Sequence, residues 1–391
     1  MKRKYKILYI QPIGAFSGSL KSSEEYIKNL YTKFDFIFFT QNGFAKKILK
    51  KYGQVFESFG LCKYDNTENS HYKGLRWLLI FREVFYVIPT ILNLLKIKFF
   101  IKDIDLIHLN EITGLPSAVL AKLIFRKPLI VHVRSLNYRN NKSLKSNLHL
   151  KILKKFANII LAIDQEVFKT VNIKNKTTLL RNILDLKRKN KKNKKINKEL
   201  KIGYIGTYLK YKGIENLIEA VEELILKDYK IKLIFAGKFL DRSFLIKNLL
   251  SWFSIDNNIN SNLFKKIFIK NMGFVKKIQN FYDQIDILCF PSSLNATGRQ
   301  IFEAGMFSIP VIVCMKSNKN DSVKNNYNGL IYNNFFSIKD LQKKILIFYN
   351  NRKLIKIMGN RGKKLALKRN MKNNNINKLT SIYKNLINKN L

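Results

Sequence analysis

The sequence predicts an α/β protein made of two halves, each a parallel sheet covered by helices. Short apolar runs typical of buried strands alternate with helix-length amphipathic stretches along most of the chain. Strands separated by helices pair in parallel through right-handed crossovers. The chain has 391 residues, of which 46% are hydrophobic, and this is enough for two globular domains.

The N-terminal half contains the first set of predicted elements. Buried strands are expected at residues 6–10, 35–39, 105–109, 129–133 and 159–162, with helices at residues 20–34, 115–125 and 143–156. The first strand leads to Gly14 and Gly18, and the simplest interpretation of these glycines is a tight turn.

Residues 75–101 form a long apolar stretch that does not predict a membrane span. About 20 unbroken apolar residues are needed to cross a bilayer, whereas charged residues and Pro89 interrupt this stretch. We expect one long helix that is kinked near Pro89 and packs mostly within the N-terminal half. The alternative is that an exposed apolar face, flanked by lysines, lies in a bilayer interface.

A run of lysines precedes the second half. Residues 187–198, KRKNKKNKKINK, lack an apolar period and are expected to be a solvated interdomain linker. Strands follow at residues 201–206, 232–236, 267–275, 285–290 and 311–313, and the tail after residue 340 is helical and rich in lysine. The predicted domains are therefore residues 1–185 and 199–355, with a basic linker at 186–198 and a helical tail at 356–391.

Residues 285–313 carry the most functional information. A buried strand is followed by a turn at Pro291, a polar loop that ends at Gly298, and a helix that contains Glu303. A loop that leads from a parallel strand into a helix N-terminus is where open α/β sheets bind ligands, and the free amides there favour phosphate. Glu303 lies too far into the helix to cap it, so its carboxylate is placed to accept hydrogen bonds from ribose hydroxyls. An ordinary corner with a solvated glutamate is the alternative.

Residues 201–221 repeat this arrangement. A short strand ends at Gly206, a loop carries Lys212 and Gly213, and an amphipathic helix follows. Gly206 allows the backbone to approach a ligand closely, and Lys212 offers a positive charge for a diphosphate.

Together the two segments resemble the C-terminal domain of family-4 retaining glycosyltransferases, which have the GT-B fold. That family shows G-R-x-x-x-x-K-G and, further on, P-S-x-x-E-G-F-G-x-x-x-x-E-A. The matching residues here are G-T-Y-L-K-Y-K-G from Gly206 and P-S-S-L-N-A-T-G-R-Q-I-F-E-A from Pro291. Asp321 and the N-G-L turn at residues 328–330 match at the usual separation. Several elements in order are more specific than a single glycine-rich loop.

The resemblance implies two Rossmann-like domains that face each other across a cleft, with the helical tail crossing back to the first domain. The donor site that it implies consists of Gly206, Thr207, Lys212, Asn295, Gly298, Arg299 and Glu303. Glu303 would hold the ribose, Lys212 and Arg299 the diphosphate, and these three would carry catalysis. On the acceptor side the resemblance points to Gly18, His132 and Arg134.

The sequence departs from the family pattern at two positions. Asn295 replaces the first acidic residue of the second motif, and it can still hydrogen-bond to the transferred sugar although it has no charge. Thr207 stands where the family commonly has an arginine for the diphosphate. We expect Arg299 to supply the missing guanidinium, because a planar fork suits phosphate.

The resemblance further implies the reaction. A sugar would move from a nucleotide-diphosphate donor to a glycan or lipid-linked acceptor with retention of anomeric configuration, in the synthesis of a bacterial surface polysaccharide. No cofactor is expected, because the nucleotide sugar is a substrate. No metal is expected either, since no grouping in the chain has metal-ligand spacing.

Composition limits the remaining possibilities. The net charge of +47 arises from lysines spread over the whole chain, without a nucleic-acid-binding motif, so we expect no specific nucleic-acid partner. Such a surface is nevertheless attracted to anionic lipid. Cys62, Cys289 and Cys314 are far apart, which favours a reducing, cytoplasmic setting, with the inner face of the plasma membrane as a further hypothesis. The N-terminus is basic but continues into a strand and does not resemble a signal peptide.

Two other functions are compatible with these features. An epimerase or hydrolase that uses nucleotide sugars can be built on the same scaffold, since a fold does not determine its chemistry. A non-enzymatic protein that binds polyanions is the second alternative, and it predicts binding that depends steeply on salt.

Overall fold

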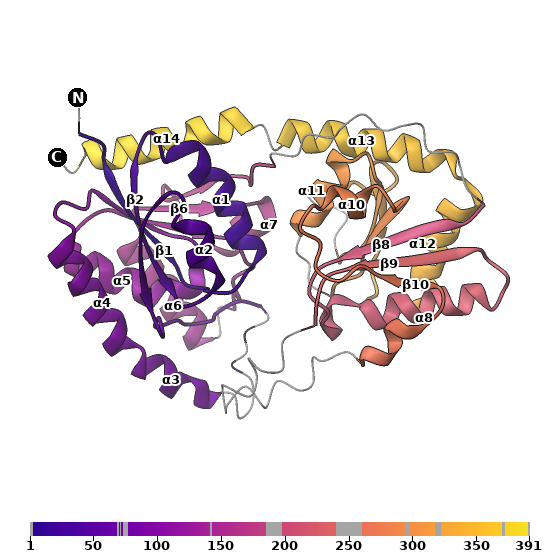
Figure 1. Ribbon diagram of the computed structural model, residues 1–391, viewed down its shortest axis with the longest axis horizontal. Coiled ribbons are helices and arrows are strands. Elements are labelled where there is room, and N and C mark those ends of the chain that lie inside the picture. Colours follow the sequence, from indigo (N-terminus) through magenta and orange to yellow (C-terminus); the bar gives the residue numbers. More distant parts are fainter. Residues whose placement is uncertain are drawn as a thin grey trace. The chain divides into compact units, whose positions relative to one another are not determined.

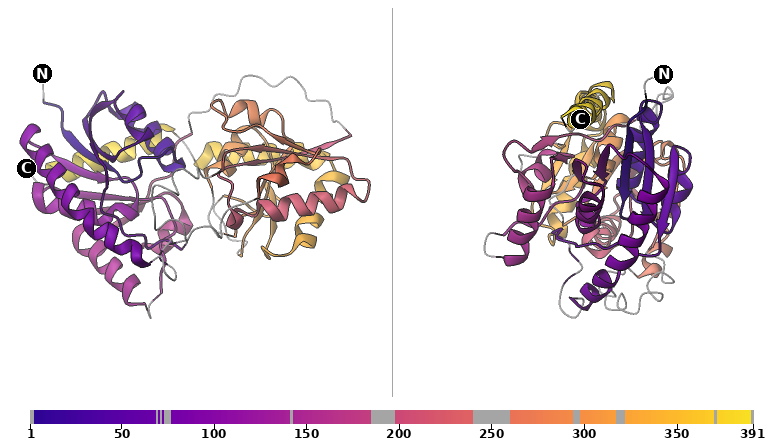
Figure 2. Two further views of the ribbon diagram at one scale, coloured as in Figure 1. Left: turned by 60° about the horizontal axis from the view of Figure 1, so that its bottom comes forward. Right: turned by 90° about the vertical axis from the view of Figure 1, so that its left-hand side faces the viewer.

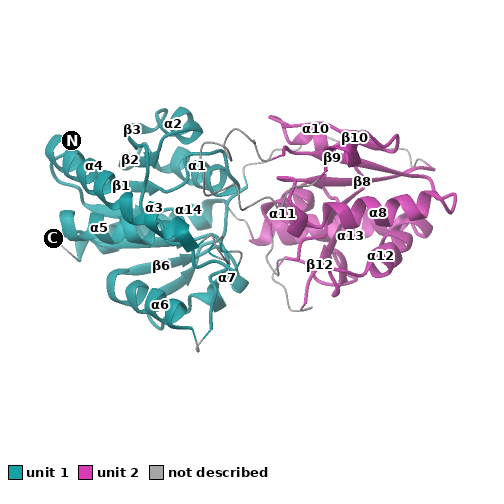
Figure 3. Ribbon diagram, turned by 90° about the horizontal axis from the view of Figure 1, so that it is seen from below, with its two compact units in different colours: residues 1–185, 370–391 teal, residues 186–369 magenta. Residues whose placement is uncertain are grey.

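The computed structural model describes residues 3–68, 70, 72, 77–140, 143–184, 198–239, 260–293, 298–316, 322–369 and 372–389. Two compact units make up the chain, and Figure 3 shows them in different colours. Unit 1 comprises residues 1–185 and 370–391, and unit 2 comprises residues 186–369. The α/β class predicted from the sequence is confirmed in both units.

Unit 1 is built on a parallel sheet whose seven strands follow the order β3-β2-β1-β4-β5-β6-β7. Its strands are β1 Lys6–Gln11, β2 Asp35–Gln41, β3 Gly53–Ser58, β4 Leu106–Leu109, β5 Leu129–Val133, β6 Ile159–Ala162 and β7 Thr177–Leu179. The central strands are almost wholly apolar because helices cover both faces of a parallel sheet. The carboxyl ends of β1, β4 and β5 therefore lie side by side at one edge.

Helices connect and cover these strands. In unit 1 they are α1 Gly18–Leu30, α2 Phe44–Leu49, α3 Leu79–Phe85, α4 Val87–Phe100, the short 3-10 helix η2 Ile112–Gly114, α5 Leu115–Phe125, α6 Leu144–Phe156, α7 Gln165–Thr170 and α14 Lys372–Asn388. Helix α14 comes from the end of the chain, and Figures 1 and 2 show it in yellow along unit 1. Its residues Ile376, Leu379 and Tyr383 share a buried cluster with β1, β2 and α1, so this last helix completes the core of unit 1.

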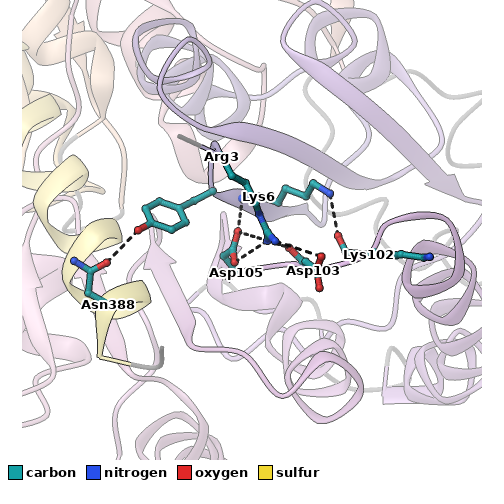
Figure 4. Close-up of polar contacts among 7 residues, drawn as sticks. Arg3, Lys6, Lys102, Asp103, Asp105 and Asn388 are labelled. Carbon is teal, nitrogen blue, oxygen red and sulfur yellow. Dashed lines mark hydrogen bonds and ion pairs between the residues drawn. The ribbon is translucent and has the colours of Figure 1, made fainter. Parts of the chain in front are cut away.

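Polar contacts fix the opposite, amino-terminal edge of the same sheet (Figure 4). Arg3 pairs with Asp103 at 3.3 Å and with Asp105 at 3.2 Å. Asp105 also accepts a hydrogen bond from the Lys6 backbone amide at 2.7 Å. The Tyr5 hydroxyl lies 3.3 Å from Asn388 Oδ1, so the start of β1 is linked to both β4 and α14.

The long apolar stretch forms two helices where the sequence predicts one. The break between α3 and α4 lies at Tyr86, three residues before the predicted kink at Pro89. Proline has no amide hydrogen to donate and is tolerated only in the first turn of a helix, so the chain starts a new helix ahead of it. Among the described residues, no helix combines the length and apolar character that crossing a membrane requires.

Unit 2 contains a second parallel sheet, with strand order β10-β9-β8-β11-β12-β13. Its strands are β8 Leu200–Ile205, β9 Ile231–Ala236, β10 Ile269–Asn271, β11 Ile287–Phe290, β12 Val311–Cys314 and β13 Gly329–Tyr332. Its helices are η3 Lys210–Lys212, α8 Ile214–Ile225, η5 Ser261–Lys265, α10 Gln279–Tyr282, α11 Arg299–Met306, α12 Ile338–Asn350 and α13 Lys353–Arg369. The predicted strand at 267–275 is shorter than expected and ends before Gly273, whose φ of 61° leaves the strand conformation.

The helical tail divides at a different place from the one the sequence predicts. Helix α13, which spans most of the first part of the predicted tail at 356–391, belongs to unit 2, and only the residues from 370 onward belong to unit 1. The reason is close packing of α13 against α11, where a Cβ on Gly305 would lie 2.9 Å from the Gly362 carbonyl oxygen. Most of the predicted basic linker, residues 186–197, lies outside the described residues.

Candidate active site

In unit 2, the loops that follow β8 and β11 are held together at the carboxyl edge of the sheet. The Ser293 amide donates a hydrogen bond of 2.9 Å to the Tyr211 carbonyl, and the Ser293 hydroxyl donates another of 3.1 Å. Gly213 has a φ of 71°, and a Cβ on it would collide with the Pro291 carbonyl. Glycine is therefore required at the point where the Lys212 loop meets the β11 loop.

Lys212 lies in this junction with aromatic rings around its ammonium group. Its Nζ is 5.2 Å from the ring centre of Tyr211 and 5.5 Å from that of Phe290. Burial lowers the pKa of Lys212 to about 8. Among the described residues no carboxylate pairs with it, so a partly desolvated positive charge stands beside two loop ends. An anion bound here would compensate the desolvation and raise the pKa of Lys212 again.

The start of α11 contains a buried ion pair. Arg299 Nε donates to Glu303 Oε1 at 2.8 Å, and the two side chains are only 9% and 5% exposed. The Tyr282 hydroxyl lies 3.2 Å from Glu303 Oε2, and burial, together with the neighbouring carboxylate, raises the pKa of Tyr282. The two residues that the sequence assigns separately to diphosphate and ribose thus contact each other. The carboxylate is buried, unlike the solvated glutamate of the alternative interpretation.

Glycines bring the rest of this region close to the ion pair. Gly206 has a φ of 153°, and the position of a Cβ on it would be 3.7 Å from Gln300 Nε2 at the start of α11. Gly298 precedes α11, which has no side-chain N-cap, and a Cβ there would lie 3.0 Å from the Phe290 ring. The structure therefore places Gly206, Lys212, Gly298, Arg299 and Glu303 in one region of unit 2.

Two other predicted donor residues have different outcomes. Thr207 follows Gly206, and its carbonyl accepts a hydrogen bond of 3.0 Å from the Tyr204 hydroxyl. Asn295 lies outside the described residues. Next to Ser293 there is a small cavity of about 150 Å³, lined also by Cys314, Met315, Lys316 and Phe335.

In unit 1, His132 and Arg134 belong to a buried polar network at the end of β5. Arg134 donates to Asn110 Oδ1 at 2.7 Å and to Asn182 Oδ1 at 2.6 Å, and its Nη2 lies 3.2 Å from His132 Nδ1. Burial and the neighbouring guanidinium lower the pKa of His132 well below its ordinary value. His132 is therefore neutral and cannot serve as a proton donor at neutral pH.

A second histidine of this network is held in the same way. Burial and Arg134 lower the pKa of His108 to about 3. Its Nδ1 lies 2.6 Å from the Tyr383 hydroxyl of α14, and its ring stacks on Tyr9 with 4.7 Å between centres. These contacts indicate that His108 has a structural role, joining the sheet to the last helix.

Glu111 completes the polar groups at this edge. It lies two residues after the end of β4, and its φ of 155° is unusual for a residue with a side chain. Glu111 Oε1 accepts from the Ile112 amide at 2.9 Å, and Oε2 accepts from the Ser135 hydroxyl at 3.0 Å. Burial, partly offset by these hydrogen bonds, raises the pKa of Glu111 to about 7.

Gly18 is placed differently from the rest of unit 1's predicted site. It is the first residue of α1, where the Ser17 side chain accepts a hydrogen bond from the Leu20 amide. A Cβ on Gly18 would meet nothing within 4 Å, whereas one on Gly14 would collide with the backbone of Asn42. Gly14 is thus needed for close packing, whereas the space around Gly18 at the start of α1 is open.

Comparison with known proteins agrees with this arrangement. Residues 186–365 match the family described as Glycosyl transferases group 1. The chain is a glycosyltransferase with the GT-B fold, and its second unit is similar to the group 1 family. Over 334 residues it is 27% identical to the uncharacterized glycosyltransferase MJ1178 of Methanocaldococcus jannaschii, covering 79% of this chain and 85% of that protein.

Two further relatives complete the comparison. The capsular polysaccharide biosynthesis glycosyltransferase CapM of Staphylococcus aureus is 26% identical over 174 residues, which is 44% of this chain and 43% of CapM. The crystal structure of Anabaena Alr3699/HepE in complex with UDP and glucose has a TM-score of 0.72 at 16% identity, covering 97% of this chain and 99% of that chain.

The sequence did not single out two features of this glycosyltransferase. Glu111 belongs to no recognisable motif, and the available signal is its position in the loop that follows a buried strand, at the ligand-binding edge of a parallel sheet. The pairing of Arg299 with Glu303 could have been anticipated, because residues four apart are neighbours on a helix. In the described part of the chain, no three His, Cys, Asp or Glu side chains form a group able to hold a metal ion.

Proposed function

We propose that this glycosyltransferase moves a sugar from a nucleotide-diphosphate donor to a glycan or lipid-linked acceptor, with retention of anomeric configuration, in the synthesis of a bacterial surface polysaccharide. The observation that carries the proposal is Lys212. A cation that lacks a carboxylate partner among the described residues lies at the carboxyl edge of a parallel sheet. It contacts the ring of Phe290, and the same ring lies next to Gly298 at the start of α11. This combination suits the diphosphate of a nucleotide sugar.

The proposed mechanism is electrostatic. Negative charge accumulates on the diphosphate as the bond to the sugar breaks, and a fixed positive charge stabilises that state more than the starting state. Because the diphosphate raises the pKa of Lys212 from about 8, Lys212 is protonated when the donor is bound. The amides at the start of α11 add to this field. In this proposal no side chain acts as a nucleophile.

The ion pair has a specific role in the proposal. Arg299 holds the Glu303 carboxylate in place through a contact of 2.8 Å, one turn into α11. We propose that Glu303 accepts hydrogen bonds from the ribose hydroxyls when the donor is bound. Arg299 then binds the diphosphate through its guanidinium. Asn295 would face the transferred sugar. On the acceptor side we propose Gly18 together with the edge formed by His132 and Arg134.

The relatives support the substrate classes. The HepE structure contains UDP and glucose, and CapM is named for capsular polysaccharide biosynthesis. Those names describe the relatives themselves, and their donor and acceptor classes come to this chain as part of the proposal.

Product analysis tests the proposal. The purified enzyme is incubated with a panel of nucleotide sugars, with and without glycan and lipid-linked acceptors, and the new glycosidic bond is examined by NMR. We expect a product that forms only with acceptor and keeps the anomeric configuration of the donor. Donor cleavage or isomerisation at the same rate without acceptor would contradict the transfer, and an inverted product would contradict retention.

A further inference from the structure

Helices α3 and α4 present a continuous apolar face to the outside of unit 1. We call this the α3–α4 face, and its side chains are between 43% and 79% exposed: Trp77, Leu78, Phe81, Val84, Phe85, Ile88, Leu92, Leu95, Phe99 and Phe100. Figures 1 and 3 show the two helices on the outside of the unit. Single exposed apolar residues are ordinary on soluble proteins, but a row of ten indicates a partner.

The spacing of these residues explains why they share one side. From Phe81 through Ile88 and Leu92 to Phe99 they recur every three or four residues, across the break at Tyr86. The other side of the same helices, with Leu79, Leu94 and Ile97, is buried. The helices are therefore apolar on both sides, and within the described part of the chain only one side is covered.

Charge around the α3–α4 face is almost entirely positive. In residues 77–101 the only acidic residue is Glu83, which is buried and pairs with Arg82 at 2.6 Å. Lys96 and Lys98 are exposed beside the apolar row. The chain as a whole has a net charge of +47. Anionic groups attract such a surface, whereas a second copy of the chain carries the same charge and would be repelled.

We propose that the α3–α4 face lies in the interfacial layer of an anionic lipid bilayer. The apolar side chains would enter the boundary between head groups and acyl chains, with the helices parallel to the membrane plane, and Lys96 and Lys98 would contact the head groups. Trp77 is exposed, and tryptophan is favoured at membrane interfaces because its ring can contact apolar groups while its N–H stays hydrated. The binding follows from this face alone, while its purpose, access to a lipid-linked acceptor, rests on the proposed function.

Vesicle flotation tests the binding. The full chain is mixed with vesicles of phosphatidylcholine alone or of phosphatidylcholine with phosphatidylglycerol. We expect binding to the anionic vesicles only. The double variant Ile88→Glu/Leu92→Glu should lose at least about tenfold in vesicle affinity, because it replaces two apolar side chains that would enter the bilayer with charged ones. The variant Lys96→Ser/Lys98→Ser should weaken binding by a smaller factor and reduce its dependence on salt.

A matched control tests whether vesicle binding is specific to the α3–α4 face or arises from any exposed apolar residue. The double variant Leu226→Glu/Ile267→Glu changes apolar residues of unit 2 that are 80% and 98% exposed. It should bind vesicles as the parent does. Circular dichroism and thermal unfolding confirm that each variant is folded, and thermal protection by nucleotide sugars should be equal in all of them.

Several results would overturn the proposal. These are absence of parental binding to anionic vesicles, equal losses in the two double variants, or concentration-dependent dimerisation that Ile88→Glu/Leu92→Glu abolishes. The last result would assign the face to a second copy. If vesicle binding follows the expected pattern but no nucleotide sugar protects the protein, the proposed function fails and the membrane face stands.

Discussion

Two partly buried cations, Arg134 in unit 1 and Lys212 in unit 2, differ in the partners that surround them. Arg134 of unit 1 donates to two asparagine side chains at 2.7 and 2.6 Å and lies 3.2 Å from the ring nitrogen of His132. Lys212 of unit 2 has aromatic rings about 5 Å away and, among the described residues, no carboxylate partner. Both lie at the carboxyl edge of a parallel sheet, where α/β proteins bind ligands.

The difference indicates which edge is prepared for an anion. Protein groups already occupy the hydrogen-bonding directions of Arg134, so it organises the ends of β4 and β5. Lys212 carries the cost of desolvation, and no charged group in the described part of the chain offsets it. Such an arrangement is retained where a ligand supplies the missing charge. We therefore expect changes in unit 1 to affect mainly stability and changes at Lys212 to affect mainly donor binding.

The largest effect on stability is expected from the ion pair of unit 2. Glu303→Ala leaves the Arg299 guanidinium buried without its carboxylate, and breaking a buried pair costs about 3–5 kcal/mol. From the sequence, Glu303 was assigned to the ribose and Arg299 to the diphosphate, and their pairing was not predicted. Urea unfolding measures the loss. A free energy of unfolding equal to that of the parent would show that the pair contributes nothing.

The ion pair illustrates which features of the fold and the site could be predicted from the sequence and which could not. The central strands were predicted because helices cover both faces of a parallel sheet, which makes its strands near-continuous apolar runs. Strands β3, β7 and β13 were not predicted, since GQVFES and TTL are largely polar and GLIY follows an apparent turn. The predicted residues of the donor site are close together because both motifs follow neighbouring strands. The burial of Lys212 depends on Phe290 from another strand, and spacing along the chain does not reveal it.

A sharper test within unit 2 asks whether Arg299 supplies the positive charge that the family commonly has at the position of Thr207. Arg299→Ala should weaken donor binding and also destabilise the fold, because Glu303 loses its partner. Adding Thr207→Arg should restore part of the donor affinity but not the stability, since residue 207 contributes charge near the diphosphate only. Calorimetry with a nucleotide diphosphate and urea unfolding report the two properties separately. No recovery of affinity in the double variant would count against this role of Arg299.

In unit 1, Glu111 should make stability depend on pH. Its pKa is raised from 4.5 to about 7 in the folded chain, so the folded state favours the protonated carboxyl. The stabilisation is full below pH 4.5, is lost as pH rises to about 7, and amounts to at most about 3 kcal/mol. Glu111→Gln should remove this dependence and be the more stable protein above pH 7. The free energy of unfolding of both proteins is measured between pH 5 and 7. Equal slopes against pH would refute the raised pKa of Glu111.

The smallest effect is expected from Arg134→Gln. The variant leaves amide groups of Asn110 and Asn182 without their donor, at a cost of about 1–3 kcal/mol in stability. Donor affinity should stay within about twofold of the parent value, because the change lies in unit 1. A large loss of nucleotide affinity would contradict the division of roles between the two cations.

The most direct test compares two neighbouring lysines of η3. Lys210 is exposed and Lys212 is enclosed by Tyr211 and Phe290, so Lys210→Gln is a matched control for Lys212→Gln. Affinity for a nucleoside diphosphate and for its nucleotide sugar is measured by calorimetry in the parent and both variants. We predict that Lys212→Gln loses at least about tenfold, equivalent to about 1.4 kcal/mol, and that Lys210→Gln stays within about twofold. Equal affinities in the two variants would contradict the claim that Lys212 is the cation held for the donor diphosphate.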